Sequence, residues 1–364
     1  MKKILFAAYS LDLGGIEKAL VTLANTLQEK EYDVTIVLEQ IKGVFLDDLN
    51  KNIKLIEYRP RETKNILKRK IANFLKRIKF VMKYKNKFDF SACFATYSNS
   101  SAFVARKVSK NNCLWGHADY LTLFENNVED MKKFFEEKKY NKFKHIVFVS
   151  KEGQESFLKV FPEMKNKTIV CNNLIDSKKI TQMSKEKIDI DKDSEKVTFV
   201  NIGRHEEKQK KLTRIIMAAK KLKEEKYNFK ILFVGDGPDT ERYKELVKSE
   251  KLEDVIIFLG KKKNPYPYYR ISDCVILSSD YEGYPVVFLE SFVLEKPIIT
   301  TKVSDYEEVE GRGLIAEKSE DDIYEKMKIF IENGFKNEKK FDVDLYNENI
   351  IKTIERLFWK ELKC

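Results

Sequence analysis

The chain has 364 residues, of which 43% are hydrophobic and 35% charged, with 25 Phe and 17 Tyr. At ~100 to 200 residues per domain this length predicts two domains, and the apolar content excludes both a disordered chain and a single small binding module. The formal net charge is +11, yet residues 61–87 alone hold 11 Lys/Arg and one acidic residue. The rest of the chain is nearly neutral, so the excess charge belongs to one segment.

The cysteines, at positions 93, 113, 171, 274 and 364, form no Cys-x-x-Cys pair. This argues against a disulfide framework or a zinc site and favours a reducing, cytoplasmic setting. The apolar run after Lys2 and Lys3 is too short for a signal peptide and reads as a first strand. No run approaches the ~18 apolar residues that span a bilayer.

Short apolar runs alternate along the chain with longer segments of helical period, as in parallel α/β sheets. In the first half this pattern predicts strands at 4–9, 34–38, 90–96, 145–150 and 168–172. In the second half it predicts strands at 197–203, 230–235, 255–260, 274–278 and 298–301. The polar stretch 177–196 reads as a linker, and apolar residues at helical spacing in 345–362 predict a closing helix.

We therefore expect two doubly wound, Rossmann-like α/β domains, at residues 1–180 and 181–345. The closing helix, at about 346–364, is expected to pack back on the first domain. In such folds ligands bind outside the carboxyl ends of the strands, so the functional residues should follow strands.

Three groups of residues follow predicted strands in this way. Gly14 and Gly15 open a helix, where a backbone turn can approach a ligand closely, although two glycines also simply make a tight turn. Gly203 and Arg204 end a strand, with Lys210 in the next loop; a guanidinium and an ammonium suit a diphosphate, although Lys208, Lys210 and Lys211 also read as a solvated charge run.

The third group begins at Glu282, at a helix start marked by Gly283 and Pro285, and ends at Glu290 about two helical turns further on. Two carboxylates so placed can take hydroxyl groups at both ends of a nucleotide sugar. The backbone amides around the segment Gly283 to Val287, which includes Tyr284, Pro285 and Val286, are then expected to face its phosphates. A helix cap explains Glu282 alone but not the combination.

With these motifs the chain resembles the GT-B glycosyltransferases of the retaining family 4 type, which build bacterial surface polysaccharides. The resemblance is carried by Gly14-Gly15-Ile16-Glu17, Gly203-Arg204 with Lys210, Gly235-Asp236-Gly237-Pro238, Asn264-Pro265-Tyr266-Pro267-Tyr268 and the Glu282 to Glu290 motif, in the family's order. It implies two domains facing a cleft, an acceptor-binding first domain and a donor-binding second domain.

By this resemblance, Arg204 and Lys210 hold the donor diphosphate, Glu290 binds the ribose hydroxyls and Glu282 holds hydroxyls of the transferred sugar. Gly14, Gly15 and His117 are expected on the acceptor side, and His117 is expected to hydrogen-bond the donor sugar or polarise the acceptor hydroxyl. The family works without a cofactor or a bound metal, and no metal-binding motif stands out in this sequence.

Three positions depart from the family's pattern: His205 replaces an apolar residue, Lys211 a glycine, and the loop of Val303, Ser304 and Asp305 a glycine pair. The departures leave the details of both loops open. The choice of Lys210 rather than Lys211 as the phosphate-binding lysine rests on alignment.

Residues 67–83 combine apolar side chains at three- and four-residue steps with Lys68, Arg69, Lys76, Arg77, Lys79 and Lys83 on other faces. This predicts a cationic amphipathic helix, part of whose apolar face is expected to pack on the core. Its charge exceeds what solubility requires, so we expect docking on the anionic inner face of the cell membrane. The stretch lacks a nucleic-acid reading motif, so nucleic acid is not an expected partner.

The predicted activity is transfer of a hexose or N-acetylhexosamine from a nucleoside diphosphate sugar, with UDP favoured by family habit, to a growing glycan. A lipid-linked or oligosaccharide acceptor is expected, in a pathway of capsule, exopolysaccharide or lipopolysaccharide type. Two alternatives stay open: a sugar-nucleotide epimerase of the same fold, and a non-catalytic lipid- or nucleic-acid-binding protein with a degenerate donor site.

Overall fold

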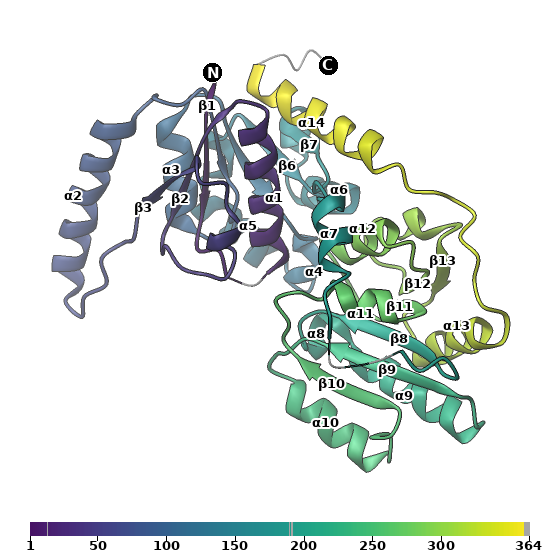
Figure 1. Cartoon of the computed structure of the whole chain (residues 1–364). Helices are drawn as coiled ribbons and strands as arrows, with labels where there is room; N and C mark the ends of the chain where they lie inside the picture. Colours follow the sequence, from purple (N-terminus) through teal and green to yellow (C-terminus); the bar gives the residue numbers. More distant parts are fainter. Residues whose placement is uncertain (13, 189, 191, 360–364) are drawn as a thin grey trace. The chain divides into compact units, whose positions relative to one another are not determined.

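The computed structural model describes residues 1–12, 14–188, 190 and 192–359 (Figure 1). Its contacts divide the chain into two compact units: residues 1–174 with the segment from Asp344 onward, and residues 175–343. The domain boundaries predicted from the sequence lie instead between residues 180 and 181 and between residues 345 and 346. Each unit is an α/β structure around its own parallel sheet.

The first unit is built on a parallel sheet in the order β3-β2-β1-β4-β5-β6-β7. The strands are β1 (Lys3–Ala8), β2 (Asp33–Leu38), β3 (Lys54–Glu57), β4 (Phe90–Cys93), β5 (Asn112–Gly116), β6 (His145–Phe148) and β7 (Thr168–Val170). The side chains of β1, β4 and β6 are almost entirely buried, as expected of inner strands covered by helices on both faces.

The helices of this unit begin mostly at short polar side chains that accept a hydrogen bond from the first turn. Such caps are Asn65, Ser98, Asp119, Asn127 and Ser150. The helices are α1 (Gly15–Glu29), α2 (Ile66–Tyr84), α3 (Asn99–Val108), α4 (Tyr120–Leu123), α5 (Val128–Glu137), α6 (Lys151–Val160) and α14 (Val343–Trp359), with 3₁₀ turns η1 (Leu46–Asp48), η2 (Tyr140–Lys142) and η3 (Pro162–Lys167).

The second unit has a parallel sheet in the order β10-β9-β8-β11-β12-β13. Its strands are β8 (Val197–Ile202), β9 (Phe229–Val234), β10 (Ile256–Gly260), β11 (Cys274–Leu277), β12 (Ile298–Thr301) and β13 (Gly313–Ala316). Its helices are α7 (Ser177–Met183), α8 (Glu207–Lys210), α9 (Leu212–Glu224), α10 (Thr240–Ser249), α11 (Tyr266–Ile271), α12 (Val286–Val293) and α13 (Glu320–Asn333), with the 3₁₀ turn η4 (Tyr306–Val309).

The ten strands predicted from the sequence are all present, but β3, β5 and β13 are missing from the prediction. β3 and β13 are edge strands in which the apolar runs are short, Leu55-Ile56 in β3 and Leu314-Ile315-Ala316 in β13, and β3 is mostly exposed. β5 is buried, but only three apolar residues stand between Asn112 and Gly116, too few for a periodic signal.

The expected linker at 177–196 is wrong in its first part, because α7 occupies Ser177–Met183. Asp176 caps this helix by accepting a hydrogen bond from the Lys179 amide at 2.9 Å, and Ile180 is buried. The helix packs on α11 and α12 of the second unit. A single buried apolar residue in so short a helix leaves little periodicity to detect.

The closing helix is confirmed as α14, which belongs to the first unit. The Phe358 ring lies 5.4 Å from the Tyr32 ring and 4.8 Å from the Phe90 ring. The side-chain amide of Asn111 donates to the carbonyl of Leu357 at 2.7 Å. The last part of the predicted helix, residues 360–364 with Cys364, lies outside the described residues.

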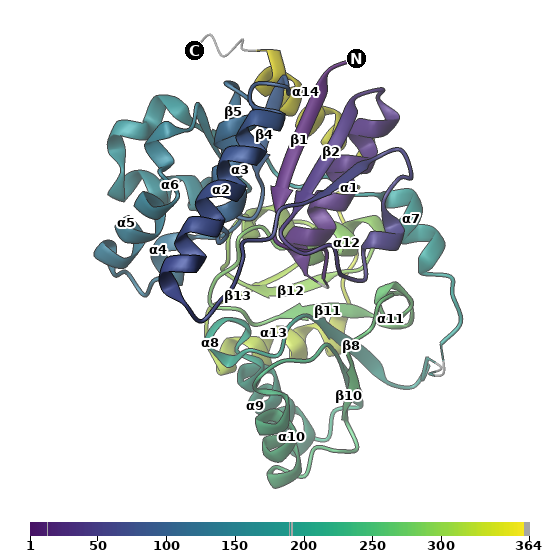
Figure 2. The same cartoon turned by 90° about the vertical axis from the view of Figure 1, so that its left-hand side faces the viewer.

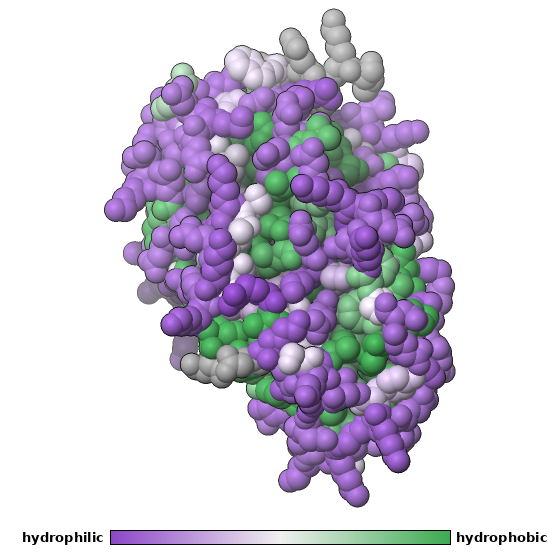
Figure 3. Space-filling view, turned by 45° about the vertical axis from the view of Figure 1, so that its right-hand side comes forward, coloured by the Kyte–Doolittle hydropathy of each residue, from purple (hydrophilic) through white to green (hydrophobic). Residues whose placement is uncertain are grey.

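The cationic helix is present as α2, but the expected packing of its apolar face is wrong. Within α2 only Phe80 is buried, while Leu67, Phe74 and Met82 are 68%, 63% and 78% exposed. Hydrophilic residues predominate on the face drawn in Figure 3, with apolar patches between them. Among the described residues no helix is both long and apolar enough to cross a membrane.

Candidate active site

The glycine-arginine turn lies directly after β8, at the carboxyl edge of the second sheet. A Cβ atom on Gly235 would stand 1.8 Å from the Gly203 carbonyl oxygen, and one on Gly237 would stand 2.2 Å from the His205 carbonyl oxygen. Both glycines are therefore required for the loops after β8 and β9 to lie against each other. Arg204 follows with its side chain 67% exposed and a guanidinium nitrogen 3.5 Å from a Glu206 carboxylate oxygen.

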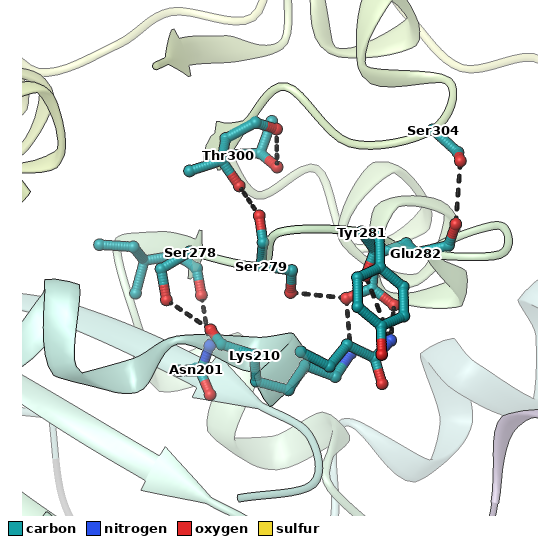
Figure 4. Close-up of polar contacts among 11 residues, drawn as sticks. Asn201, Lys210, Ser278, Ser279, Tyr281, Glu282, Thr300 and Ser304 are labelled. Carbon is teal, nitrogen blue, oxygen red and sulfur yellow. Dashed lines mark hydrogen bonds and ion pairs between the residues drawn. The ribbon is translucent and has the colours of Figure 1, made fainter. Parts of the chain in front are cut away.

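Lys210 and Glu282, predicted from separate motifs, form an ion pair in which Nζ lies 2.6 Å from Oε1 (Figure 4). Ser279 donates to the same oxygen at 2.6 Å, and the Gln209 side-chain amide donates to Oε2 at 3.2 Å. The hydroxyl of Ser304 donates to the Glu282 backbone carbonyl at 2.9 Å. The Glu282 side chain is only 8% exposed. Buried polar atoms need hydrogen-bond partners, and each carboxylate oxygen of Glu282 has a donor.

The loops after β8 and β11 are tied together, which brings Lys210 to Glu282. Ser278 donates to the carbonyls of Lys210 and Lys211 at 2.8 and 3.0 Å, and the Asp280 amide donates to the Gln209 carbonyl at 2.8 Å. Since β8 and β11 are neighbours in the sheet, residues 72 positions apart in the sequence meet at one point. The prediction missed Gln209, which stands beside Lys210, and Ser279, which stands three residues before Glu282.

Lys211, where the resemblance implies a glycine, has the left-handed backbone angles φ 50° and ψ 44°. Glycine adopts this conformation without steric cost, whereas a lysine is strained in it. The turn between α8 and α9 therefore keeps the backbone conformation that a glycine would adopt at this position. The Lys211 ammonium lies 3.6 Å from an Asp280 carboxylate oxygen, so Lys211 pairs with Asp280 and Lys210 is the lysine that pairs with Glu282.

Glu290 lies in the middle of α12 and is 4% exposed. The Tyr269 hydroxyl donates to Oε2, and the Tyr266 hydroxyl donates to Oε1 at 3.5 Å. Both tyrosines come from α11, which begins in the Asn264-Pro265-Tyr266-Pro267-Tyr268 motif. Burial, together with the Glu290 charge, raises the pKa of Tyr269, so its hydroxyl stays protonated and available as a donor.

The start of α12 differs in part from the expectation. The helix begins at Val286 after Pro285, and Val286 and Val287 are partly exposed. Tyr284, however, is 6% exposed and its hydroxyl donates to Glu308 at 2.9 Å, so its ring is part of the interior. The amides near Gly283 are candidate phosphate ligands, and that role stays a prediction.

The loop of Val303, Ser304 and Asp305, which replaces the family's glycine pair, has a defined conformation in the structure. Ser304 is buried against the Glu282 backbone, and Asp305 has a positive φ of 55°. His205 is fully buried, and its Nδ1 lies 3.0 Å from the Thr240 hydroxyl oxygen. It packs among Phe233, Tyr243 and Phe258 and thus takes the place of an apolar residue.

The residues predicted on the acceptor side belong to the first unit. Gly14 caps α1 and Gly15 is its first residue, directly after the β1 turn. A Cβ atom on Gly14 would stand 2.2 Å from a Glu17 carboxylate oxygen, so Gly14 leaves room for Glu17 to fold over the helix start. The Tyr97 hydroxyl donates to the other Glu17 oxygen at 3.1 Å.

His117 follows β5, with its ring centroid 4.5 Å from that of Phe94. Burial lowers the pKa of His117 to about 3, so the imidazole is neutral at pH 7. Its Nε2 atom is buried and has no hydrogen-bond partner among the described residues. A neutral ring nitrogen of this kind can accept a hydrogen bond from a hydroxyl group.

No group of three or more His, Cys, Asp or Glu side chains suited to a metal ion occurs in the parts of the chain that the structure describes. The cysteines at 93, 113, 171 and 274 are free and buried. Burial raises the pKa of the Cys93 and Cys113 thiols, which makes them poor nucleophiles.

Comparison with known proteins connects this geometry to a family. Residues 182–346 match the family Glycosyl transferases group 1, so the second unit carries such a domain. The chain is 26% identical over 362 residues to N-acetylgalactosamine-N,N'-diacetylbacillosaminyl-diphospho-undecaprenol 4-alpha-N-acetylgalactosaminyltransferase of Campylobacter jejuni, covering 93% of this chain and 94% of that protein. It is also 29% identical over 203 residues to an uncharacterised glycosyltransferase of Methanocaldococcus jannaschii; this match covers 54% of this chain and spans only 49% of that protein.

Among solved structures, Anabaena Alr3699/HepE in complex with UDP and glucose superposes with a TM-score of 0.74 at 18% identity, covering 98% of this chain and 100% of that chain. A likeness at this identity shows the fold, which is the predicted pair of Rossmann-like α/β domains of the GT-B type. The expected fold class is thereby confirmed.

Proposed function

We propose that the protein transfers a hexose or an N-acetylhexosamine from a nucleoside diphosphate sugar to a hydroxyl of a lipid-linked bacterial surface glycan. The observation that carries the proposal is the buried pair of Lys210 and Glu282, 2.6 Å apart at the carboxyl edge of the donor-domain sheet, in a unit that also buries Glu290. The group 1 family match and the Campylobacter relative support a sugar-transfer reaction. The solved UDP complex of Alr3699/HepE supports UDP as the nucleotide.

In the proposed reaction the bond between the anomeric carbon and the diphosphate oxygen breaks, and its electron pair leaves with the nucleoside diphosphate. Arg204 and Lys210 stabilise the negative charge that develops on the leaving diphosphate, because their positive groups are in place before the reaction. The acceptor oxygen attacks the same face of the sugar, so the anomeric configuration is retained. The proton of the acceptor hydroxyl passes to the departing phosphate oxygen, so the step balances without a cofactor or metal ion.

Glu282 and Glu290 are proposed to bind hydroxyls, of the transferred sugar and of the ribose, and not to act as the acid and nucleophile of a hydrolase. The bonds that Glu290 accepts from Tyr266 and Tyr269 keep its carboxylate oriented. His117, neutral at pH 7, is proposed to accept a hydrogen bond from a hydroxyl beside Gly14 and Gly15. With a lipid-linked acceptor, the protein is proposed to work peripherally at the inner face of the cell membrane.

The first experiment is thermal stabilisation of the protein by UDP, GDP, ADP and CMP sugars. A ligand at 100 times its Kd adds ~2.7 kcal/mol to the free energy of unfolding, which shifts the midpoint measurably. We expect one nucleotide class to stabilise the wild type, and Arg204→Ala and Glu290→Ala to lose the effect. Arg242→Ala is the matched control, because Arg242 is also exposed, at 60%, and also lies near an acidic side chain.

The product then separates transfer from the alternatives. Incubation of the stabilising donor with a lipid-linked acceptor is expected to give a glycosylated lipid whose new anomeric centre, read by NMR, keeps the donor's configuration. Chelation of divalent metal should leave the rate unchanged. Release of an isomerised sugar nucleotide would instead identify an epimerase, and failure of every nucleotide to stabilise the folded wild type would contradict the donor site.

A further inference from the structure

Helix α2 presents its apolar side chains away from the unit that carries it. At ~100° per residue, Phe80, the buried residue of the helix, marks the direction of the unit, and Ile71, Ile78 and Met82 lie within about 20° of the opposite direction. The exposed apolar residues on this side form what we name the apolar stripe. The apolar stripe consists of Leu67 (68% exposed), Ile71 (52%), Phe74 (63%), Leu75 (52%), Ile78 (41%) and Met82 (78%).

The side of α2 toward the unit carries polar side chains and the aromatic rings of Phe80 and Tyr84. The backbone amide of Arg61 donates to the Asn73 side-chain oxygen at 2.7 Å, and the Asn73 nitrogen donates to the Arg61 carbonyl at 3.1 Å. The Phe80 ring lies 4.7 Å from the Tyr58 ring and 4.9 Å from the Tyr84 ring. These contacts fix the orientation of the helix beside α3 (Figure 2). The apolar stripe is therefore held outward by specific bonds.

The six basic residues predicted for membrane contact fall into two groups. Arg69, Lys76, Arg77 and Lys83 lie within about 60° of Phe80, on the side toward the unit. Three of them have partners there: Lys76 donates to the Arg59 carbonyl, the Arg77 guanidinium lies 5.2 Å from the Phe103 ring centre, and the Lys83 ammonium lies 5.1 Å from the Tyr84 ring centre. Lys68 and Lys79 instead border the apolar stripe, where long side chains can extend to lipid headgroups while their stems cover apolar surface.

Resting on the proposed function, with its lipid-linked acceptor, we propose that the apolar stripe of α2 inserts into the interface of an anionic phospholipid bilayer, with Lys68 and Lys79 on the headgroups. The helix has no acidic residue, and residues 61–87 carry a net charge of +10. Two copies that paired their stripes would bring two such charges together without a compensating acid. An anionic bilayer supplies both the apolar phase and the opposite charge, as for other interfacial amphipathic helices.

Cosedimentation of the full chain with vesicles tests the surface directly. We expect binding to equimolar phosphatidylglycerol and phosphatidylcholine, weakened by salt, and little binding to phosphatidylcholine alone. The double variant Ile71→Ser and Ile78→Ser should lower the partition coefficient roughly tenfold or more. Its matched control is Ile41→Ser with Val128→Ser, because these residues of the same unit are 42% and 39% exposed but lie outside α2.

The charge contribution has its own pair of variants. Lys68→Gln with Lys79→Gln should weaken binding by about thirtyfold, since each basic residue at an anionic surface contributes about a factor of five. Lys107→Gln with Lys110→Gln removes the same charge from exposed positions elsewhere in the unit and should have a smaller effect. Ile78→Trp should show a blue-shifted emission on vesicle addition that Val128→Trp does not show, because only insertion removes the indole from water.

Several outcomes would overturn the proposal. They are stripe variants that bind like the wild type, equal binding to neutral vesicles, or a dimer in light scattering that the stripe variants dissociate. Stabilisation by the nucleotide is measured without vesicles, so it separates the two proposals. The stripe variants should keep it, whereas its absence from a wild type that still binds vesicles would reject the sugar-transfer site and leave the docking surface standing.

Discussion

The Lys210 ammonium lies 2.6 Å from a carboxylate oxygen of Glu282, so the side chain proposed to bind phosphate is paired with the one proposed to bind sugar. Without the lysine, the Glu282 carboxylate would lose its ionic partner at a site where only 8% of the side chain is exposed. Breaking a buried pair from one side is costly because the other charge stays buried. The pair therefore contributes to folding as well as to the proposed chemistry.

We expect Lys210→Met to lower the free energy of unfolding by roughly 3 kcal/mol, measured by urea denaturation. Arg204→Ala should change it by less than about 0.5 kcal/mol, because the Arg204 side chain is 67% exposed. Both variants should lose stabilisation by the nucleotide. Lys210→Met combined with Glu282→Gln should lose less stability than the sum of the losses in Lys210→Met and Glu282→Gln alone, and strictly additive losses would show that the pair is not coupled.

The Tyr269 hydroxyl donates to Glu290, and its removal tests whether orientation of that carboxylate matters. We expect Tyr269→Phe to raise the KM for the donor about tenfold with a small change in kcat, since a hydrogen bond to a charged group contributes about 1.5 to 3 kcal/mol. Tyr268→Phe is the control, because Tyr268 is also buried on α11, whereas the tyrosines that donate to Glu290 are Tyr266 and Tyr269. Equal effects of the two variants would reject a positioning role for Tyr269.

Lys211 occupies a left-handed backbone position, with φ 50°. We expect Lys211→Gly to raise the free energy of unfolding by about 0.5 to 1 kcal/mol, because glycine removes the strain. Arg214, 2.7 Å from Asp280, keeps that carboxylate paired in the variant. Lys208→Gly, in the regular helix α8, should instead lower stability by a similar amount. A lower free energy of unfolding in both variants would show that the contacts of the Lys211 side chain stabilise the fold by more than the backbone strain costs.

His145 is 7% exposed, and burial, with the charges of Lys144 and Lys167, lowers its pKa to about 4. In the unfolded chain a histidine titrates near pH 6.5, so between pH 6.5 and 4 the unfolded state binds more protons. The free energy of unfolding must then fall as the pH falls through this range, by up to about 3 kcal/mol from His145. His145→Leu should flatten that dependence in urea denaturation at a series of pH values. An unchanged slope would show that other groups cause the acid sensitivity.

The inner strands were predictable because a strand covered on both faces is a run of apolar residues, as in Cys274–Leu277. The same logic located Arg204, Lys210 and Glu282, because side chains that follow neighbouring parallel strands gather at one edge. It failed for α7, whose single buried apolar residue leaves no period, and for the edge strand β3.

The partners within the site were not predictable from local patterns. Gln209 and Ser279 reach Glu282 only because the loops after β8 and β11 are tied together. Tyr269 reaches Glu290 from another helix, 21 residues away in the sequence. The outward direction of the apolar stripe on α2 depends on Asn73 and Phe80, whose contacts periodicity alone does not reveal.

Because α14 returns to the first unit, the second unit is inserted in the sequence between two segments that fold into one domain. The Tyr346 hydroxyl donates to the Asn173 carbonyl at 2.9 Å, so the chain leaves and re-enters the first unit at neighbouring points. A short linker between these points would join the first unit into one polypeptide that includes α2. Truncation before residue 344 would instead remove α14 and expose Tyr32 and Phe90, which pack against Phe358.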